Sequence, residues 1–229
     1  MSVIAANLQA VKNDIAAAAQ QAGREASAVS LLAVSKTVSA ERVREAFQAG
    51  QHAFGENYVQ EGLDKIAALD DLRSRIHWHF IGPLQSNKTR PVAEHFDWVH
   101  AIDRLKIAER LSAQRPAGMA PLQVCIQVNI SDETTKSGVP PKDVLALAQA
   151  VAALPNLQLR GLMAIPAPAD DPEAQRQPFA ALRELLDRLR QAGLQVDTLS
   201  MGMSADMDAA IAEGATLVRI GTAIFGARH

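Results

Sequence analysis

Short apolar runs alternate with stretches of helical periodicity along the whole chain. The apolar runs predict eight strands, at residues 31–36, 52–56, 76–82, 98–102, 122–130, 157–165, 196–201 and 216–220. Amphipathic stretches predict the helices between them, at residues 40–49, 58–69, 87–95, 104–113, 141–153, 173–192 and 205–213. A further helix is predicted in front of the first strand, at residues 3–22. Strands that alternate with helices in this manner form a parallel sheet.

The number of strand–helix units predicts the fold. Eight units in 229 residues fit a single (β/α)8 or TIM barrel, which typically needs roughly 250 residues. We therefore predict one domain, 1–229, with an extra N-terminal helix. A doubly wound open sheet is the alternative, but eight strands suit it less well. Only a short segment follows the eighth strand, so we expect the N-terminal helix to cover the place of the last barrel helix.

Composition and charge exclude several classes of function. The chain is 48% hydrophobic and has a formal net charge of −2, and no basic run stands out. We therefore expect neither a nucleic-acid nor a membrane partner. No apolar stretch approaches the roughly 18 residues of a membrane span, and the N-terminus has the pattern of an amphipathic helix instead of a signal peptide. The single cysteine, Cys125, lies in an apolar run. These features predict a soluble, cytoplasmic protein.

A lysine, Lys36, stands where the first predicted strand ends and a helical pattern is about to begin. In an α/β barrel the C-terminal ends of the strands form the mouth where active sites lie. Desolvation there lowers the pKa of a lysine, and its amine then becomes a nucleophile toward aldehydes. This predicts an imine with pyridoxal phosphate. The alternative is a lysine whose stem packs on the strand end while its ammonium reaches water.

The ends of the last two predicted strands have the composition of a phosphate site. The segment 199–206 leads from the seventh strand into a helix that Ser204 or Asp206 would cap, with free amide groups at the helix start. After the eighth strand, Gly221 allows close approach of a ligand and Thr222 offers a hydroxyl and an amide. Phosphate sites in barrels of this type commonly form after strands seven and eight. Each of these small residues taken alone is also typical of an ordinary turn.

An arginine, Arg219, lies inside the eighth predicted strand between Val218 and Ile220. Its side chain points to the opposite face from theirs, and a buried arginine requires a partner. Facing a pyridine nitrogen, an arginine can only donate a hydrogen bond, which keeps that nitrogen unprotonated and weakens the ring as an electron sink. The alternative is an ion pair with Asp103 or Glu56.

Two histidines, His77 and His79, share one face of the third predicted strand, as in barrel metallohydrolases. Such a metal site needs further histidines and an aspartate at other strand ends. His52 and His100 are at strand starts or middles, and no aspartate closes the eighth strand. A metal-dependent hydrolase is therefore disfavoured, and we expect His79 to form a polar wall of the pocket.

Other polar residues follow the second, third and fifth strands. Asn57 ends the second strand beside Lys36, and we expect it to hydrogen bond a substituent of the cofactor ring. Asn87 follows the third strand and is equally explained as a helix cap. A polar loop after the fifth strand holds a second lysine, Lys136, for which the sequence demands no role.

Several motifs occur in order along the chain: Ala33-Val-Ser-Lys36, Phe54-Gly-Glu-Asn-Tyr58, His79-Phe-Ile-Gly-Pro-Leu-Gln-Ser-Asn87-Lys88, Lys136-Ser-Gly138, Gly161-Leu-Met-Ala-Ile165, Leu199-Ser-Met-Gly-Met-Ser204-x-Asp206 and Arg219-Ile-Gly-Thr222 followed by Phe225-Gly226. Together they resemble the pyridoxal phosphate homeostasis protein family, once called the alanine racemase N-terminal-like proteins. The resemblance covers essentially the whole chain, and its specificity lies in the ordered set.

The resemblance implies the pyridoxal-phosphate-bearing barrel of alanine racemase, with an internal aldimine on Lys36 and Arg219 facing the pyridine nitrogen. Asn57 lies in the matching second-strand motif. Four residues would surround the phosphate: Ser200, Met201, Gly221 and Thr222. The family is regarded as binding and supplying pyridoxal 5'-phosphate inside the cell and as affecting amino-acid and keto-acid balance, without robust catalysis. Apo-enzymes that need the cofactor would be its acceptors, and we expect a monomer.

An amino-acid racemase is the alternative function. A racemase of this type needs two acid–base groups, one on each face of the aldimine. Lys36 would serve one face, and the family relationship implies that a tyrosine from a C-terminal β domain of the partner subunit serves the other. The present sequence stops at His229, so we expect no C-terminal β domain and no efficient racemisation.

Overall fold

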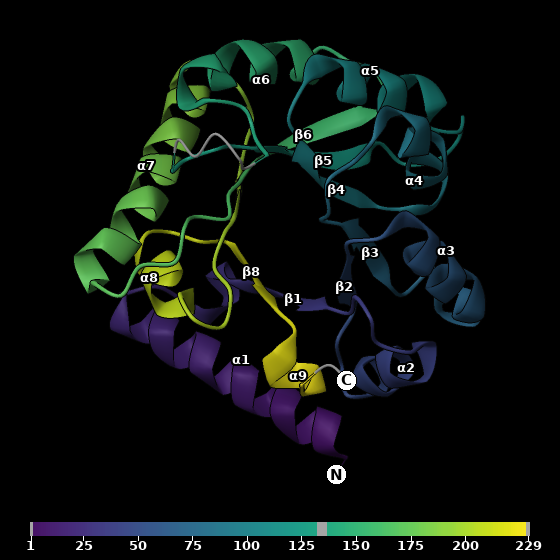
Figure 1. Ribbon diagram of the computed structural model, residues 1–229, viewed down its shortest axis with the longest axis vertical. Helices are drawn as coiled ribbons and strands as arrows, with labels where there is room; N and C mark the ends of the chain where they lie inside the picture. Colours follow the sequence, from purple (N-terminus) through teal and green to yellow (C-terminus); the bar gives the residue numbers. More distant parts are fainter. Residues whose placement is uncertain (1, 132–136, 228–229) are drawn as a thin grey trace.

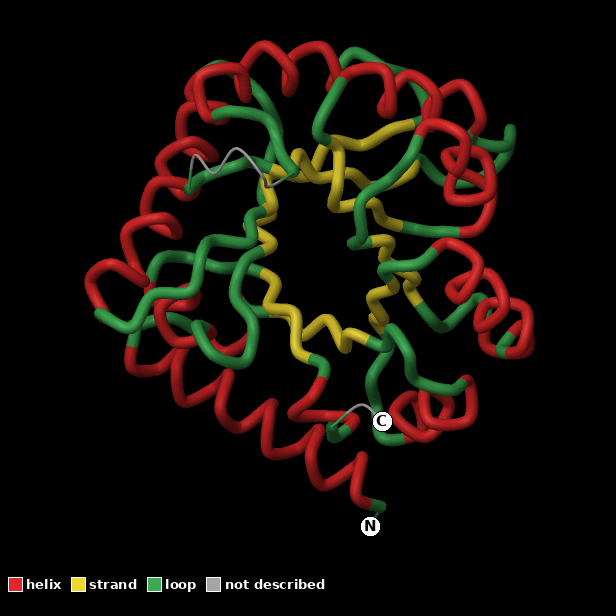
Figure 2. Tube along the Cα trace, viewed as in Figure 1, coloured by secondary structure: helices red, strands yellow, loops and turns green. Residues whose placement is uncertain are grey.

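The computed structural model describes residues 2–131 and 137–227. Within them, eight parallel strands close into a barrel, because each strand pairs with the next and the last pairs with the first (Figure 1 and Figure 2). The strands are β1 (Ser30–Val34), β2 (Ala53–Glu56), β3 (His77–Phe80), β4 (Trp98–Ile102), β5 (Leu122–Gln127), β6 (Leu157–Met163), β7 (Thr198–Ser200) and β8 (Leu217–Ile220). The predicted barrel is therefore confirmed, and the open-sheet alternative is wrong.

The helices form an outer ring around the strands (Figure 2). They are α1 (Val3–Gln21), α2 (Ala40–Gln48), α3 (Val59–Ala68), α4 (Thr89–His95), α5 (Leu105–Gln114), α6 (Val144–Ala152), α7 (Pro172–Gln191), α8 (Met207–Ala212) and α9 (Thr222–Phe225). Among the residues that the structure describes, no helix combines the length and the apolar composition needed to cross a membrane.

The N-terminal helix fills the place of the last barrel helix, as predicted. One stripe of α1 is buried, with Ile4, Leu8, Val11 and Ile15 at helical spacing. The helix lies against α8, α9 and α2 (Figure 1). The four-residue helix α9, which the sequence did not predict, forms directly after β8 under this cover.

Most elements lie within two residues of their predicted bounds, and β5 departs further. The sequence predicts a strand to residue 130, but β5 ends at Gln127. Beyond it the backbone N–H of Asn129 donates to the carbonyl of Val139 at 3.0 Å. The chain therefore leaves the barrel to pair with its own following loop, which apolar periodicity alone does not reveal.

Alternation along the strands divides the apolar side chains into two clusters. Ala33 and Phe54 belong to the large cluster between the strands and the helices. Leu32, Val34 and Leu217 belong to a small cluster on the other face of the strands, inside the barrel. The small size of this inner cluster leaves part of the barrel interior to polar side chains.

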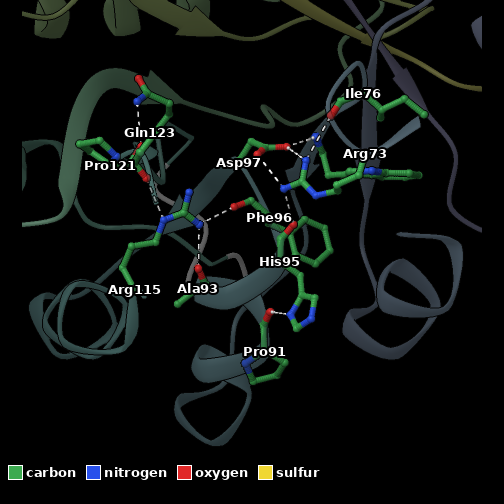
Figure 3. A network of polar contacts seen from close by, with 12 residues as sticks. Arg73, Ile76, Pro91, Ala93, His95, Phe96, Asp97, Arg115, Pro121 and Gln123 are labelled. Atoms are coloured by element: carbon green, nitrogen blue, oxygen red, sulfur yellow. Dashed lines mark hydrogen bonds and ion pairs between the residues drawn. The ribbon is translucent and has the colours of Figure 1, made fainter. Parts of the chain in front are cut away.

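Two arginines, drawn in Figure 3, hold the loops that precede β3, β4 and β5. Arg73 forms a two-point ion pair with Asp97 at 2.9 and 3.1 Å. Arg115 is buried and donates to three backbone carbonyls at 2.7–2.9 Å, those of Ala93, Phe96 and Ala120. Arg115 thereby ties the end of α4 to the loop that precedes β5.

We predict that Arg115→Ala lowers the free energy of unfolding by about 2–4 kcal/mol, because three backbone carbonyls lose a charged donor. Urea denaturation followed by circular dichroism measures this loss. Arg188→Ala removes an exposed arginine of α7 and is the matched control, with an expected change below about 0.5 kcal/mol. Equal losses in the two variants would contradict the prediction.

Candidate functional site

A cavity of about 350 Å³ opens at the C-terminal ends of β1, β2 and β8 and is called here the mouth cavity. Its polar lining consists of Lys36, Asn57, Ser204, Arg219 and Thr222. Its apolar lining includes Val34, Ile81, Ile165 and Met203. Another cavity, of about 400 Å³, lies at the opposite end of the strands between α1 and the starts of β1 and β2. In barrel enzymes the chemistry belongs to the C-terminal ends, so the mouth cavity is the candidate site.

The structure brings most of the sequence-predicted cofactor residues to this cavity: Lys36, Asn57, Arg219, Gly221 and Thr222. Three others are buried and lie outside its lining: His79, Ser200 and Met201. The Met201 side chain belongs to the main apolar cluster, and its backbone N–H donates to Leu217 within the sheet at 3.1 Å. Lys136 lies outside the described residues.

Lys36 follows β1 by two residues and lies in a tight turn. Its side chain lines the mouth cavity and is half-buried. The next residue, Thr37, has a φ of 62°, in the left-handed region that costs a non-glycine residue of order 1–3 kcal/mol. The turn that presents Lys36 to the cavity is therefore strained, and the surrounding structure must hold it in place.

Arg219 is buried inside the barrel and donates to Ser200 O at 2.6 Å, Ser200 Oγ at 2.7 Å and Ala164 O at 2.9 Å. The alternative ion pair with Asp103 or Glu56 is wrong, because Asp103 pairs with Arg104 and Glu56 with Lys65. Burial lowers the pKa of the Arg219 guanidinium to about 10, so it stays protonated at neutral pH. Among the described residues, these contacts use three of its five N–H donors, while the side chain also lines the cavity.

A buried chain of hydrogen bonds extends from Arg219 into the barrel. Ser200 Oγ lies 2.8 Å from His100 Nδ1, and His100 Nε2 lies 2.9 Å from His79 Nδ1. Burial lowers the pKa of His79 to about 3 and that of His100 well below its ordinary value, so both rings are neutral. The His79 ring stacks on Trp98 with centroids 5.1 Å apart. His79 is thus bonded within the barrel and is not among the residues that line the mouth cavity.

Only the first contact of this chain has a direction set by its chemistry. An arginine only donates, so Ser200 Oγ accepts from Arg219. In the Ser200–His100 and His100–His79 contacts, the tautomers of the two rings determine which atom donates. Sequence reasoning considered His100 only as a metal ligand and did not predict its contact with His79, which depends on the pairing of two neighbouring strands.

The metal hypothesis gains no support from the placement of the histidines. His77 is exposed at the start of β3, whereas His79 is buried and bonded to His100. Within residues 2–131 and 137–227, no three histidine, cysteine or carboxylate side chains come together as metal ligands.

The loop after β7 differs from the predicted phosphate site, in which Ser204 or Asp206 would cap the following helix. Helix α8 begins at Met207, and the Asp206 carboxylate accepts from the backbone N–H of Met203 at 2.6 Å instead of capping that helix. The groups that line the cavity at this end are the Ser204 and Thr222 side chains together with Gly221. The mouth cavity thus offers hydroxyl groups and glycine backbone where a phosphate would lie.

Asn57 presents an unsatisfied acceptor to the same region. Its Oδ1 atom is buried and has no hydrogen-bond partner among the described residues. The backbone there is tightly packed, because a Cβ atom added to Gly82 would lie 2.2 Å from Asn57 O. Buried acceptors are nearly always paired in folded proteins, so the lone Oδ1 indicates that a ligand or water donates to it.

A set of charged and polar side chains, named here the Lys65 cluster, lies behind Lys36 and consists of Lys65, Glu56, Glu61 and Ser35. Lys65 Nζ lies 2.9 Å from Glu56 Oε1 and 2.5 Å from Glu61 Oε1. Burial raises the pKa of the Glu56 carboxyl. Sequence reasoning missed Lys65 and Glu61, although their four-residue spacing on a predicted helix is the signal of an ion pair.

Comparisons with known proteins agree with this geometry. Residues 6–229 match the family described as "Alanine racemase, N-terminal domain". The "Pyridoxal phosphate homeostasis protein" of Pseudomonas aeruginosa is 63% identical over 228 residues, which cover 100% of this chain and 97% of that protein. The protein of the same name from Escherichia coli K12 is 56% identical over 229 residues, 100% of this chain and 98% of that one.

A solved structure gives the same result for the fold. The structure of PipY from Synechococcus elongatus PCC7942 with PLP bound superimposes with a TM-score of 0.84 at 38% identity, covering 97% of this chain and 100% of that chain. Sequence and fold therefore agree over essentially the full length. The chain belongs to the pyridoxal phosphate homeostasis protein family, which carries the alanine racemase N-terminal domain.

Proposed function

We propose that this protein binds pyridoxal 5'-phosphate in the mouth cavity, attached to Lys36, and acts in the homeostasis and supply of that cofactor. One observation carries the proposal: a cavity of about 350 Å³ is lined by an amine, Lys36, a fixed cation, Arg219, and hydroxyl groups, Ser204 and Thr222. The names of the relatives and the PLP-bound PipY structure support it.

The residues fit the parts of the cofactor. The Lys36 amine would condense with the aldehyde, forming a carbon–nitrogen double bond and releasing one water molecule. Ser204, Thr222 and the backbone at Gly221 would hold the phosphate, and Asn57 would meet a ring substituent. Arg219 would donate to the pyridine nitrogen. Bound pyridoxal phosphate supplies an electron sink to amino-acid chemistry, and a donor-only partner at the nitrogen weakens that sink.

The proposal includes the cellular role that the sequence predicts. The protein would hand the cofactor to apo-enzymes and thereby affect amino-acid and keto-acid balance. It would act as a cytoplasmic monomer with neither a nucleic-acid nor a membrane partner, in line with its formal net charge of −2.

We predict that purified wild-type protein loaded with pyridoxal phosphate shows a visible absorption band that borohydride abolishes, and that Lys36→Ala lacks this band. Peptide mass spectrometry after reduction should place the phosphopyridoxyl group on Lys36. Lys12→Ala is the matched control, because Lys12 borders the cavity at the opposite end of the barrel. An unchanged band in Lys36→Ala would refute the proposal.

A second prediction concerns the phosphate end. Thr222→Val should weaken the binding of pyridoxal phosphate about tenfold, because a hydrogen bond to a charged group is lost. Binding of pyridoxal, which has no phosphate, should be unchanged. Fluorescence titration with both ligands measures the two affinities. A parallel loss for both ligands would mean that Thr222 does not contact the phosphate.

The racemase alternative is tested by direct turnover. Apart from Lys36 and Arg219, the described cavity lining is apolar, amide, hydroxyl or glycine, which supports holding the cofactor over a two-base racemisation. We predict that loaded protein does not racemise L-alanine detectably while it restores activity to an apo-enzyme that needs pyridoxal phosphate. Racemisation that disappears in Lys36→Ala would favour the alternative.

A further inference from the structure

The backbone on both sides of Lys36 is held by charged side chains of helix α3. On one side, Lys65 Nζ donates to the carbonyl of Ser35 at 2.5 Å. On the other side, the backbone N–H of Thr37 donates to Glu61 Oε1 at 2.5 Å. Lys65 and Glu61 also bond to each other, so the two contacts belong to one unit. The turn that presents Lys36 is thus fixed to α3 at the residues before and after it.

The donors of the cation in the Lys65 cluster are all paired, whereas Glu56 Oε2 is buried without a hydrogen-bond partner among the described residues. Lys65 is buried, at 6% exposure, and each of its three N–H donors has an acceptor: Ser35 O, Glu56 Oε1 and Glu61 Oε1. Ser35 Oγ donates in turn to Glu56 Oε1 at 2.6 Å. Glu56 is the last residue of β2, directly before Asn57 of the mouth cavity. The cluster therefore joins the ends of β1 and β2 to α3.

Stability alone does not account for such a cluster. Desolvation of buried ions offsets most of their mutual attraction, and apolar residues of similar volume are often as stabilising. The cluster instead surrounds a position where the backbone is strained, since Thr37 has a φ of 62°. Strained residues persist only when their surroundings over-determine them. Lys65 meets that requirement, because its buried ammonium donates to the carbonyl of Ser35, directly before the turn.

We propose that Lys65, together with Glu61, is a positioning residue for Lys36, which it holds at the distance and angle needed to attach the cofactor aldehyde. The inference rests on the proposed function, because it concerns the same attachment. Lys65 acts through the backbone of residues 35–37 and does not touch the cofactor. Binding of the ring and the phosphate depends on other residues and is independent of the Lys65 cluster.

The experiment compares two ligands that differ only in their ability to react with Lys36. Pyridoxal 5'-phosphate carries an aldehyde, whereas pyridoxine 5'-phosphate carries an alcohol and forms no imine. Lys65→Met keeps the volume of the side chain and removes its charge. We expect this variant to bind pyridoxal phosphate about tenfold more weakly, with a smaller fraction trapped by borohydride. Pyridoxine phosphate affinity should stay unchanged.

A double-mutant cycle tests whether the effect passes through Lys36. In a Lys36→Ala background, Lys65→Met should no longer change the affinity for pyridoxal phosphate, because coupled residues are non-additive. Arg44→Met, which breaks the exposed pair with Asp71, is the control and should leave both affinities at the wild-type value.

Three outcomes would overturn the inference: wild-type affinity for pyridoxal phosphate in Lys65→Met, an equal loss for both ligands, or a loss that persists without Lys36. Should Lys65→Met fail to fold, Glu61→Leu removes the acceptor of Thr37 and should show the same ligand selectivity. Glu61→Gln keeps an oxygen acceptor and should lose less. A failure of the proposed function gives a different result, because Lys36→Ala would then bind both ligands with wild-type affinity.

Discussion

Closure of the barrel is the constraint on which the site depends. The pairing of β1 with β8, from Ser30 opposite Leu217 to Ala33 opposite Ile220, joins the beginning of the chain to its end. Because all strands are parallel, their C-terminal ends meet at one rim. Lys36 after β1 and Thr222 after β8 thereby line one cavity although they are remote in sequence.

Buried cations are the second organising feature, and each is satisfied by oxygen acceptors. Arg219 is held by two backbone carbonyls and the Ser200 hydroxyl inside the barrel. Lys65 is held by two carboxylates and a carbonyl behind β1. Charges of this kind are costly to bury unless they are paired and hydrogen-bonded. Both arrangements therefore fix geometry: Arg219 is held in the lining of the mouth cavity, and the backbone beside Lys36 is held by Lys65.

The sequence was sufficient for features that depend on periodicity and chain order. Strand–helix alternation predicted the barrel, and the small segment after the eighth strand predicted the cover by α1. The sequence did not predict the partners of buried polar side chains, because contacts between residues that are remote in the sequence determine those partners. The alternative partner for Arg219 was a carboxylate, Asp103 or Glu56, but Glu56 is paired with Lys65, and two backbone carbonyls accept from Arg219. His79 was expected on the cavity wall, but it is buried in a contact with His100 of the adjacent strand and is not among the residues that line the cavity.

The groups that line the phosphate end of the mouth cavity affect how tightly a cofactor would bind. In the described residues, the cavity meets the phosphate region with the hydroxyl groups of Ser204 and Thr222 and with Gly221. Hydroxyl groups bind a phosphate dianion less strongly than an arginine fork does, because the guanidinium adds a positive charge and two parallel N–H donors. The imine at Lys36 would then contribute a large share of the total affinity. Since imine formation is reversible through the addition of water, a protein built this way retains the cofactor while the lysine is in position and releases it when the bond opens. A cavity in which one reversible bond contributes a large share of the affinity would suit supply better than permanent retention.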